Sequence, residues 1–292
     1  MQKFDIGEWV NQKPDQRTFR QAVHIILTAI AGTPSLQTNM IMKGGVLLAI
    51  GYNSQRYTKD IDFSTAIKRS SFDVDDFRRQ FEESLLYAVE TAGYGLDCQI
   101  QNCISRPENE NATFPSIQIS IGYAEKGSPA HKRLLAKKAT MVVRIDYSLN
   151  EPVEEPVLFE LEKDNLIYTY SFVEMVAEKL RGVLQQEERK RFRRQDIYDL
   201  HYLLSDQPLR EDTKTKETIL ARLIDKSKNR NLLVDPNAMS NPEIRRRSEA
   251  EYKKLAPEIE GDLPPFDEIY NFVESFYLRL PWKCYISSPF WQ

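Results

Sequence analysis

The stretch that most constrains the fold is residues 41–63, with the sequence IMKGGVLLAIGYNSQRYTKDIDF. Acidic and apolar residues alternate at its end, which predicts a short strand. Asp60 and Asp62 would point to one side of this strand, and Ile61 and Phe63 would point into a core. Two carboxylates on one side repel each other unless a cation lies between them. Mg²⁺ suits this position, because proteins bind it through one or two carboxylates together with substrate phosphates.

A glycine pair precedes the apolar run in the same stretch. Gly44 and Gly45 would let the backbone approach a ligand closely and turn its N–H groups toward phosphate oxygens, often where a helix begins. The residues alone also fit a glycine turn followed by a solvated acidic strand edge, and this alternative stays open.

The glycine pair, the apolar run and Arg-x-x-x-Asp-Ile-Asp-Phe from Arg56 onward resemble the signature of the polymerase-β-like nucleotidyltransferases. In particular, they resemble the AbiEii/AbiGii toxin family of bacterial abortive-infection and toxin–antitoxin systems. The resemblance implies an α+β fold, in which a mixed sheet with flanking helices is followed by a mainly helical C-terminal domain. The sequence departs from the family at Val46, where a residue with a hydroxyl group is common, and in a slightly long spacing from Gly45 to Asp60.

The length of 292 residues predicts about two domains. Because the pattern changes near Asp164 from short strands to helices, we expect a nucleotidyltransferase core over residues 1–164. By the resemblance, residues 165–292 would form a helical domain that completes the active-site cleft. Helices are predicted over residues 16–32 and 74–92, and the second of these has Asp73 as its N-cap and Gly93 at its end.

The composition is that of an ordinary soluble protein, with a net charge of −3. Cys98, Cys103 and Cys284 form no Cys-x-x-Cys pair, which argues against zinc and disulfides and favours a reducing cytoplasm. No apolar stretch approaches the ~20 residues that a membrane span needs. We therefore expect a cytoplasmic protein without a membrane partner.

Short strands are predicted at residues 117–121, 142–147 and 157–162. Asp146 lies on the second of them, and an acid in an apolar strand is uncommon without a partner. The resemblance makes Asp146 the third metal-facing carboxylate. Glu160 and Glu162, on the third strand, remain alternatives, whereas Glu151 lies among prolines in a predicted solvated turn.

A second set of candidates follows in the helical part. Ser171 and Glu174 form a capping box, and the helix that they open is expected to run to about Arg189. Lys179 lies within the apolar stripe of this helix, so it either extends to solvent or points to an anion. Gly182, one turn later, leaves room beside it.

The sequence EKL…R-x-D-x-x-D-L again resembles the AbiEii/AbiGii family, in which a helix lysine and an Asp-x-x-Asp follow the core. Asp196 and Asp199 supply the two aspartates. From the residues alone, Asp196 caps the next helix and both acids pair with nearby arginines. The resemblance instead makes them part of the nucleotide-binding site.

Two basic segments could supply a surface for RNA. Residues 126–138 hold five Lys or Arg and form either a solvated loop or an acceptor-binding loop. Residues 189–194 hold five positive charges without an acid. Phe192 and Tyr198 could stack on bases or belong to the core.

The resemblance implies a Mg²⁺-dependent enzyme that transfers an NMP from an NTP to RNA, with the 3′ end of a tRNA as the expected acceptor and growth arrest as the outcome. An AbiEi-like antitoxin would be its partner. Two Mg²⁺ ions would be held by Asp60, Asp62 and Asp146. The nucleotide would be bound by Gly44, Gly45, Arg56, Lys179, Asp196 and Asp199, and Lys179 would also be catalytic. The alternatives are a small-molecule or protein acceptor, and a catalytically silent nucleotide-binding subunit.

Overall fold

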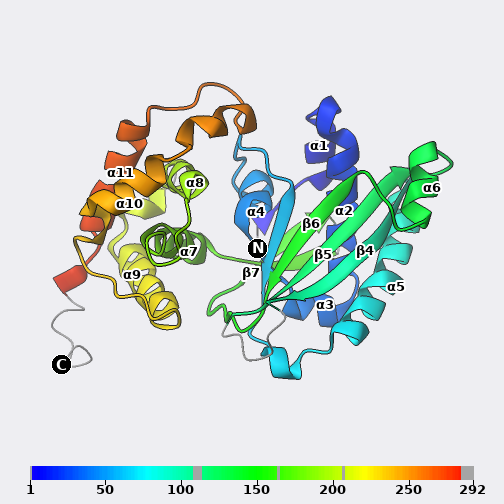
Figure 1. Ribbon diagram of the computed structural model, residues 1–292, viewed down its shortest axis with the longest axis horizontal. Coiled ribbons are helices and arrows are strands. Elements are labelled where there is room, and N and C mark those ends of the chain that lie inside the picture. Colours follow the sequence, from blue (N-terminus) through cyan, green and yellow to red (C-terminus); the bar gives the residue numbers. More distant parts are fainter. Residues whose placement is uncertain (1, 108–113, 163–164, 206–207, 284–292) are drawn as a thin grey trace. The chain divides into compact units, whose positions relative to one another are not determined.

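The computed structural model describes residues 2–107, 114–162, 165–205 and 208–283. The chain forms two compact units (Figure 1). The first comprises Met1–Asn53 and Thr58–Tyr170, and the second comprises Ser54–Tyr57 and Ser171–Gln292. Residues 163–164, where the sequence predicts the domain boundary, lie outside the described residues.

A mixed sheet forms the centre of the first unit, with eight strands among the residues described. The parallel pairs are β1–β7, β8–β2 and β3–β6, and the other neighbours are antiparallel. In spatial order the strands are β1 (Gln2–Lys3), β7 (Val157–Glu162), β8 (Asn165–Thr169), β2 (Ile41–Lys43), β3 (Asp60–Ser64), β6 (Val142–Ser148), β5 (Ser116–Glu125) and β4 (Leu96–Arg106). The predicted mixed sheet is confirmed.

Helices α2 (Arg17–Ala31) and α5 (Val74–Ala92) pack against each other and against the sheet (Figure 1). The Asp73 side chain caps α5 by accepting hydrogen bonds from the N–H groups of Asp75 and Asp76. The helix ends at Gly93, whose φ of 65° is left-handed. The first unit also contains the 3₁₀ turns Pro14–Gln16 and Arg69–Ser71 and the helices α1 (Ile6–Asn11), α3 (Pro34–Asn39), α4 (Gly44–Gly51) and α6 (Pro129–Leu135).

The second unit is mainly helical, as predicted. Ser171 caps α7 by accepting a hydrogen bond from the Glu174 N–H (3.3 Å). Helix α7 packs against α8, α9 and α10, and α8 also packs against α11. The helices are α7 (Phe172–Leu184), α8 (Arg194–Ser205), α9 (Thr213–Lys228), α10 (Pro242–Glu249) and α11 (Phe266–Leu278), with 3₁₀ turns at Pro208–Glu211, Ala238–Ser240 and Tyr252–Glu258.

Four local features differ from the predictions. The helix that begins after Ser171 ends at Leu184, five residues before Arg189. Strand β8 follows residue 164, where the chain is expected to become mostly helical. Residues 129–135 form helix α6, where a loop was expected. Glu151, expected in a solvated turn, is buried.

No helix in the described part of the chain is both long and apolar enough to cross a membrane. Cys98 and Cys103 are free thiols, and Cys284 lies outside the described residues.

Candidate active site

The first candidate group lies on β3 and β6 of the central sheet. Asp62 and Asp146 are directly opposite each other in the parallel register of these strands. Ile61 and Ile145, their neighbours along the chain, are almost fully buried. The two aspartate side chains therefore project from the opposite face of the sheet. Neighbouring strands are ~4.8 Å apart. The fold therefore brings together two carboxylates that are far apart in the sequence.

Asp60 lies two residues before Asp62 on the same face of β3 and is exposed to solvent. The alternative carboxylates, Glu160 and Glu162, lie on β7, which is separated from β3 by β8 and β2. Glu162 pairs with His24 at 3.3 Å. Of the three later acids, Asp146 is thus the one that lies beside Asp62.

Gly44 allows the Asp62 side chain to lie against the start of α4. The φ of Gly44 is +78°, and a Cβ at this position would be 2.0 Å from Oδ2 of Asp62. Gly45 follows in the first turn of α4, where backbone N–H groups have no partner within the helix. The glycine pair therefore provides both the space for the carboxylate and N–H donors beside it.

Replacing Gly44 by alanine is expected to lower activity by about a hundredfold, because the new methyl group displaces Asp62 by an ångström or more. The left-handed backbone adds a stability loss of about 1–2 kcal/mol. Gly95→Ala is the matched control, since Gly95 has a φ of +69° and a methyl group there would meet no atom within 4 Å. Gly95→Ala should show the loss of stability without the loss of activity. Equal activity of the two variants would contradict the role given to Gly44.

Lys43 and Glu151 form a largely buried ion pair beside these aspartates, which sequence reasoning missed. Lys43, on β2, is opposite Asp62 of β3, and the Lys43 Nζ lies 3.0 Å from Oε2 of Glu151. Its ammonium also donates to Oγ of Ser148 at 3.3 Å. The available signal was a lysine directly before the glycine pair, in a strand otherwise formed by apolar residues.

The aspartates on this face influence one another electrostatically. Partial burial raises the pKa of Asp146 above its ordinary value. Lys43 and a hydrogen bond from Ser116 act to lower this pKa, whereas the charges of Glu151 and Asp60 raise it further. A carboxyl group in this environment favours a nearby cation, since positive charge would offset both burial and the neighbouring acids.

Because the Lys43–Glu151 pair is largely shielded from water, Lys43→Met and Glu151→Gln should each destabilise the protein by about 2 kcal/mol. The double variant should lose less than the sum, with a coupling energy of about 1–3 kcal/mol in urea unfolding. The exposed pair Arg78–Glu82 on α5 is the control, with an expected coupling of about 0.5 kcal/mol. Additive effects at Lys43 and Glu151 would exclude a direct interaction.

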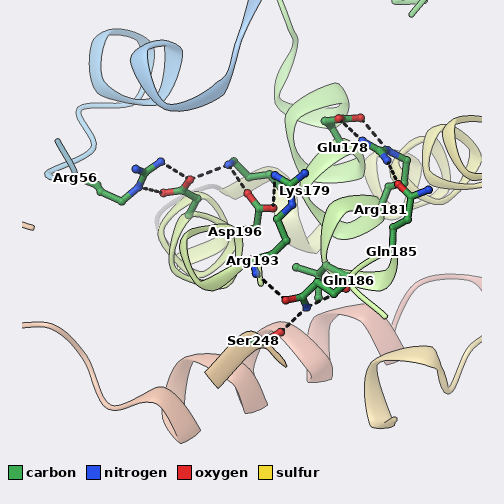
Figure 2. A network of polar contacts seen from close by, with 11 residues as sticks. Arg56, Glu178, Lys179, Arg181, Gln185, Gln186, Arg193, Asp196 and Ser248 are labelled. Carbon is green, nitrogen blue, oxygen red and sulfur yellow. Dashed lines mark hydrogen bonds and ion pairs between the residues drawn. The ribbon is translucent and has the colours of Figure 1, made fainter. Parts of the chain in front are cut away.

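The second candidate group lies within the second unit and includes Arg56, Lys179 and Asp196 (Figure 2). These residues surround the carboxylate of Asp199. The Arg56 guanidinium donates from Nε to Oδ1 and from Nη2 to Oδ2 of this carboxylate, both at 2.8 Å. Lys179 Nζ lies 2.7 Å from Oδ2 of Asp199 and 3.3 Å from Oδ1 of Asp196. Asp199 is fully buried, so its charge is balanced by the two cations alone among the described residues.

Three segments supply these residues. Lys179 comes from the middle of α7, and Asp196 and Asp199 come from the first two turns of α8. Arg56 lies in a short extended segment, which pairs with Ile259. A Cβ at Gly182 would be 3.0 Å from Oδ2 of Asp196, so the absent side chain leaves room for this carboxylate.

The ion pairs shift the ionisation of the buried groups. Burial acts to raise the pKa of Asp199, but Arg56 and Lys179 outweigh it and hold this pKa below its ordinary value. Burial and Arg56 act to lower the pKa of Lys179, but Asp199 and Asp196 raise it above its ordinary value. Asp199 and Lys179 are therefore both charged near neutral pH.

The sequence predicted part of this arrangement. Of the two alternatives for Lys179, extension to solvent or contact with an anion, the structure shows the second. The anion is a pair of carboxylates of the chain itself. Asp196 lies in the first turn of α8, which begins at Arg194, so it is not the expected N-cap. One nearby arginine, Arg193, does pair with Asp196 (3.7 Å), but the main partner of Asp199 is the distant Arg56.

Comparison with known families identifies the chain. Residues 25–272 match the family described as "Nucleotidyl transferase AbiEii toxin, Type IV TA system". The match covers well over half of the chain and includes every candidate residue. The protein belongs to the AbiEii family. It is therefore a nucleotidyltransferase, as the resemblance implied.

Two solved structures from Helicobacter pylori are similar to this AbiEii-family chain. JHP933 has a TM-score of 0.50 at 16% identity, and the alignment covers 94% of this chain and 95% of that one. A presumed nucleotidyltransferase of H. pylori gives a TM-score of 0.49 at 15% identity, covering 94% and 99%. At this identity the likeness to JHP933 concerns the fold alone. No curated protein matches the chain.

Membership of the AbiEii nucleotidyltransferase family implies an NTP substrate and, as is usual for such enzymes, a divalent metal. Among the described residues, no three His, Cys, Asp or Glu side chains are gathered closely enough to hold a metal ion. Asp62 and Asp146 nevertheless fit Mg²⁺ in kind, because they present oxygen donors on one face of the sheet. Mg²⁺ needs only one or two carboxylates when phosphates and water complete its coordination.

Proposed function

We propose that this AbiEii-family enzyme transfers an NMP from an NTP to an RNA acceptor in a Mg²⁺-dependent reaction. The observation that carries the proposal is the alignment of Asp62 with Asp146 beside the Gly44 turn. A fold that places two carboxylates together, with the N–H groups of a helix start next to them, suits a reaction in which a phosphorus centre and a hydroxyl group must be aligned.

In this mechanism Asp60, Asp62 and Asp146 would hold the proposed pair of Mg²⁺ ions, which would supply charge neutralisation and lower the pKa of the attacking hydroxyl. Asp62 or Asp146 would orient the acceptor hydroxyl and accept its proton. The N–H groups of Gly44 and Gly45 would donate to oxygens of the triphosphate.

Arg56, Lys179, Asp196 and Asp199 stay predicted nucleotide-binding residues, with Lys179 also catalytic. Within their own unit the acidic and basic side chains of this group neutralise one another. This pairing gives the two aspartates a positioning role. Asp196 and Asp199 hold the Lys179 ammonium in one position, and a fixed charge stabilises a phosphate better than a mobile one.

The acceptor and the biological role extend the proposal. We infer an RNA acceptor, with the 3′ end of a tRNA as the first candidate, and support for it comes from the two basic segments of the chain. The family is that of a type IV toxin, which supports a role in toxin–antitoxin or abortive-infection defence against phage and an AbiEi-like antitoxin as partner. Such a system would act in the cytoplasm.

The experiment incubates the purified full chain with each labelled NTP, Mg²⁺ and total tRNA, with an EDTA arm. Label in tRNA that depends on Mg²⁺ is the expected result. Label in a small molecule or in protein would replace the RNA acceptor, and nucleotide binding without release of pyrophosphate would indicate a silent binding subunit. Transfer that is unchanged in EDTA would exclude the metal.

A further inference from the structure

The connector between α7 and α8, residues 185–193, is a basic segment with a defined conformation. The Arg189 N–H donates to the Gln185 carbonyl (3.1 Å), and the Arg191 N–H donates to the Gln186 carbonyl (3.0 Å). Lys190 has a positive φ of 51°. The connector therefore turns on itself at the place where its cations are concentrated.

A buried glutamine fixes the two ends of this connector (Figure 2). The Gln186 side chain accepts a hydrogen bond from the Arg193 N–H (2.7 Å). Its amide nitrogen donates to Oγ of Ser248 on α10 (2.9 Å) and to the Val183 carbonyl (3.0 Å). Gln186 is only 1% exposed, so these bonds are shielded from water. These hydrogen bonds therefore anchor both ends of the segment between residues 186 and 193.

Three cations of the connector carry no ion pair in the described part of the chain. Arg189, Lys190 and Arg191 are all exposed and none lies within 4.0 Å of a carboxylate oxygen. By contrast, Arg193 pairs with Asp196 and Arg194 pairs with Glu251 and Glu258. Partial desolvation of its exposed side chain and repulsion from nearby arginines lower the pKa of Arg189, although Glu188 acts to raise it. This local excess of positive charge favours a polyanion.

An aromatic side chain lies in the same group of cations. Phe192 is 48% exposed, whereas Tyr198, the other stacking candidate, is buried in α8. An exposed aromatic ring among unpaired cations is the combination that single-stranded nucleic acids bind, because the bases stack on the ring while the cations contact the backbone. The basic segment at residues 126–138 has no exposed aromatic residue among those described and exposes Leu135 instead.

We propose that residues 189–192 bind a single-stranded segment of nucleic acid, with Phe192 stacked on an unpaired base and Arg189, Lys190 and Arg191 on the adjoining phosphates. The inference rests on the proposed RNA acceptor, and it adds that an unpaired part of that acceptor is recognised. A duplex is excluded as the main ligand because its bases are stacked on each other and their faces are inaccessible.

The test measures binding of the full-length protein to fluorescent oligoadenylate, alone and annealed to oligouridylate, over a range of salt concentrations. Phe192→Ala should weaken single-strand binding about five- to 150-fold, and Phe192→Trp should restore it. Arg191→Gln should instead reduce the slope of log K against log salt by about 0.7, the value for one phosphate contact in a single strand. Binding to the duplex should be weaker and unaffected by Phe192→Ala.

Two surface variants in the same unit serve as controls. Leu233→Ala removes an apolar side chain that is 84% exposed, and Lys253→Gln removes an exposed lysine that does not belong to the connector. Both should bind as the unmodified protein does. Wild-type affinity of Phe192→Ala would overturn the inference. So would single-strand binding no tighter than duplex binding, or a preference for polyglutamate, which would indicate an acidic protein as the partner.

The failure of the inference and that of the proposed function can be told apart by repeating the binding in the Asp62→Asn background. There, transfer should be lost while binding through Phe192 is retained. Transfer to RNA by the wild type with no effect of Phe192→Ala on binding would reject the connector alone. Binding through Phe192 with no transfer to any RNA would reject the proposed function and leave the connector as a nucleic-acid site.

Discussion

Replacing Asp62 by asparagine is expected to lower nucleotidyl transfer at least about a thousandfold, equivalent to roughly 4 kcal/mol of transition-state stabilisation. Asparagine keeps the shape of the side chain but removes the negative charge opposite Asp146. Asp146→Asn should cause a loss of similar size. Because both acids act on the same group, the double variant should be little worse than either single one. The measurement is the initial rate of label transfer from NTP to RNA.

The same variants separate catalysis from stability. Since burial and neighbouring acids raise the pKa of Asp146, the folded state disfavours its charged form, and this costs stability above the ordinary pKa of the group. Asp146→Asn should therefore unfold at the same or a higher temperature in EDTA. Glu125→Gln, at the exposed end of β5 in the same sheet, is the control with unchanged activity. More than about a tenth of wild-type activity in both aspartate variants would show that the site lies elsewhere.

Removing the Asp199 carboxylate is expected to cost about 3–5 kcal/mol of stability at neutral pH, the largest stability effect predicted for this chain. Asp199→Ala removes the buried acid that Arg56 and Lys179 share and leaves these two cations with only the longer contacts to Glu258 and Asp196. Urea unfolding of the full chain measures the loss. The control is Asp225→Ala on α9, whose carboxylate is 57% exposed and 3.8 Å from Arg222, and whose loss should cost less than about 1 kcal/mol.

The pH dependence of this effect has a defined sign. The folded pKa of Asp199 is lowered, so its contribution is present above the unfolded value of about 3.9 and is lost as the pH falls through the folded value. The pKa of Lys179 is raised, so its contribution is present below about 10.4 and is lost as the pH rises through the folded value. Asp199→Ala should flatten the acid side of the stability profile. If the free energy of unfolding of Asp199→Ala lay within about 1 kcal/mol of the wild-type value, the buried network would not be a source of stability. Under the proposed mechanism, Lys179→Ala should in addition lose transfer activity.

Local sequence signals predicted those elements whose ends are set by the chain next to them. Helix α5 begins after Asp73 and ends at Gly93, as expected, because an aspartate cap and a left-handed glycine act within one turn. Strand β3 has Ile61 and Phe63 buried and Asp60 exposed, because alternation fixes the two faces of any strand that has one side in a core.

Residues whose environment depends on distant partners were harder to predict. The sequence around Glu151 is typical of a solvated turn. Glu151 is nevertheless buried, because Lys43, more than a hundred residues earlier, pairs with it. Arg56 precedes the DxD strand, yet its guanidinium pairs with Asp199, 143 residues later, and this partner is not predicted. Nothing in the spacing of the sequence specifies such pairs.

The sequence by itself determined the elements to which we assign the chemistry: a strand with two aspartates on one face, a glycine turn that opens a helix, and a lysine on the apolar side of α7. Alternation, capping and the special backbone of glycine act over a few residues and can be recognised without the fold. The tertiary structure alone decided that Asp146, and neither Glu160 nor Glu162, lies opposite Asp62, and that Lys179 is held by two carboxylates. Strand order and buried ion pairing depend on which surfaces meet when the whole chain folds, because burial makes these contacts strong and local sequence does not encode them.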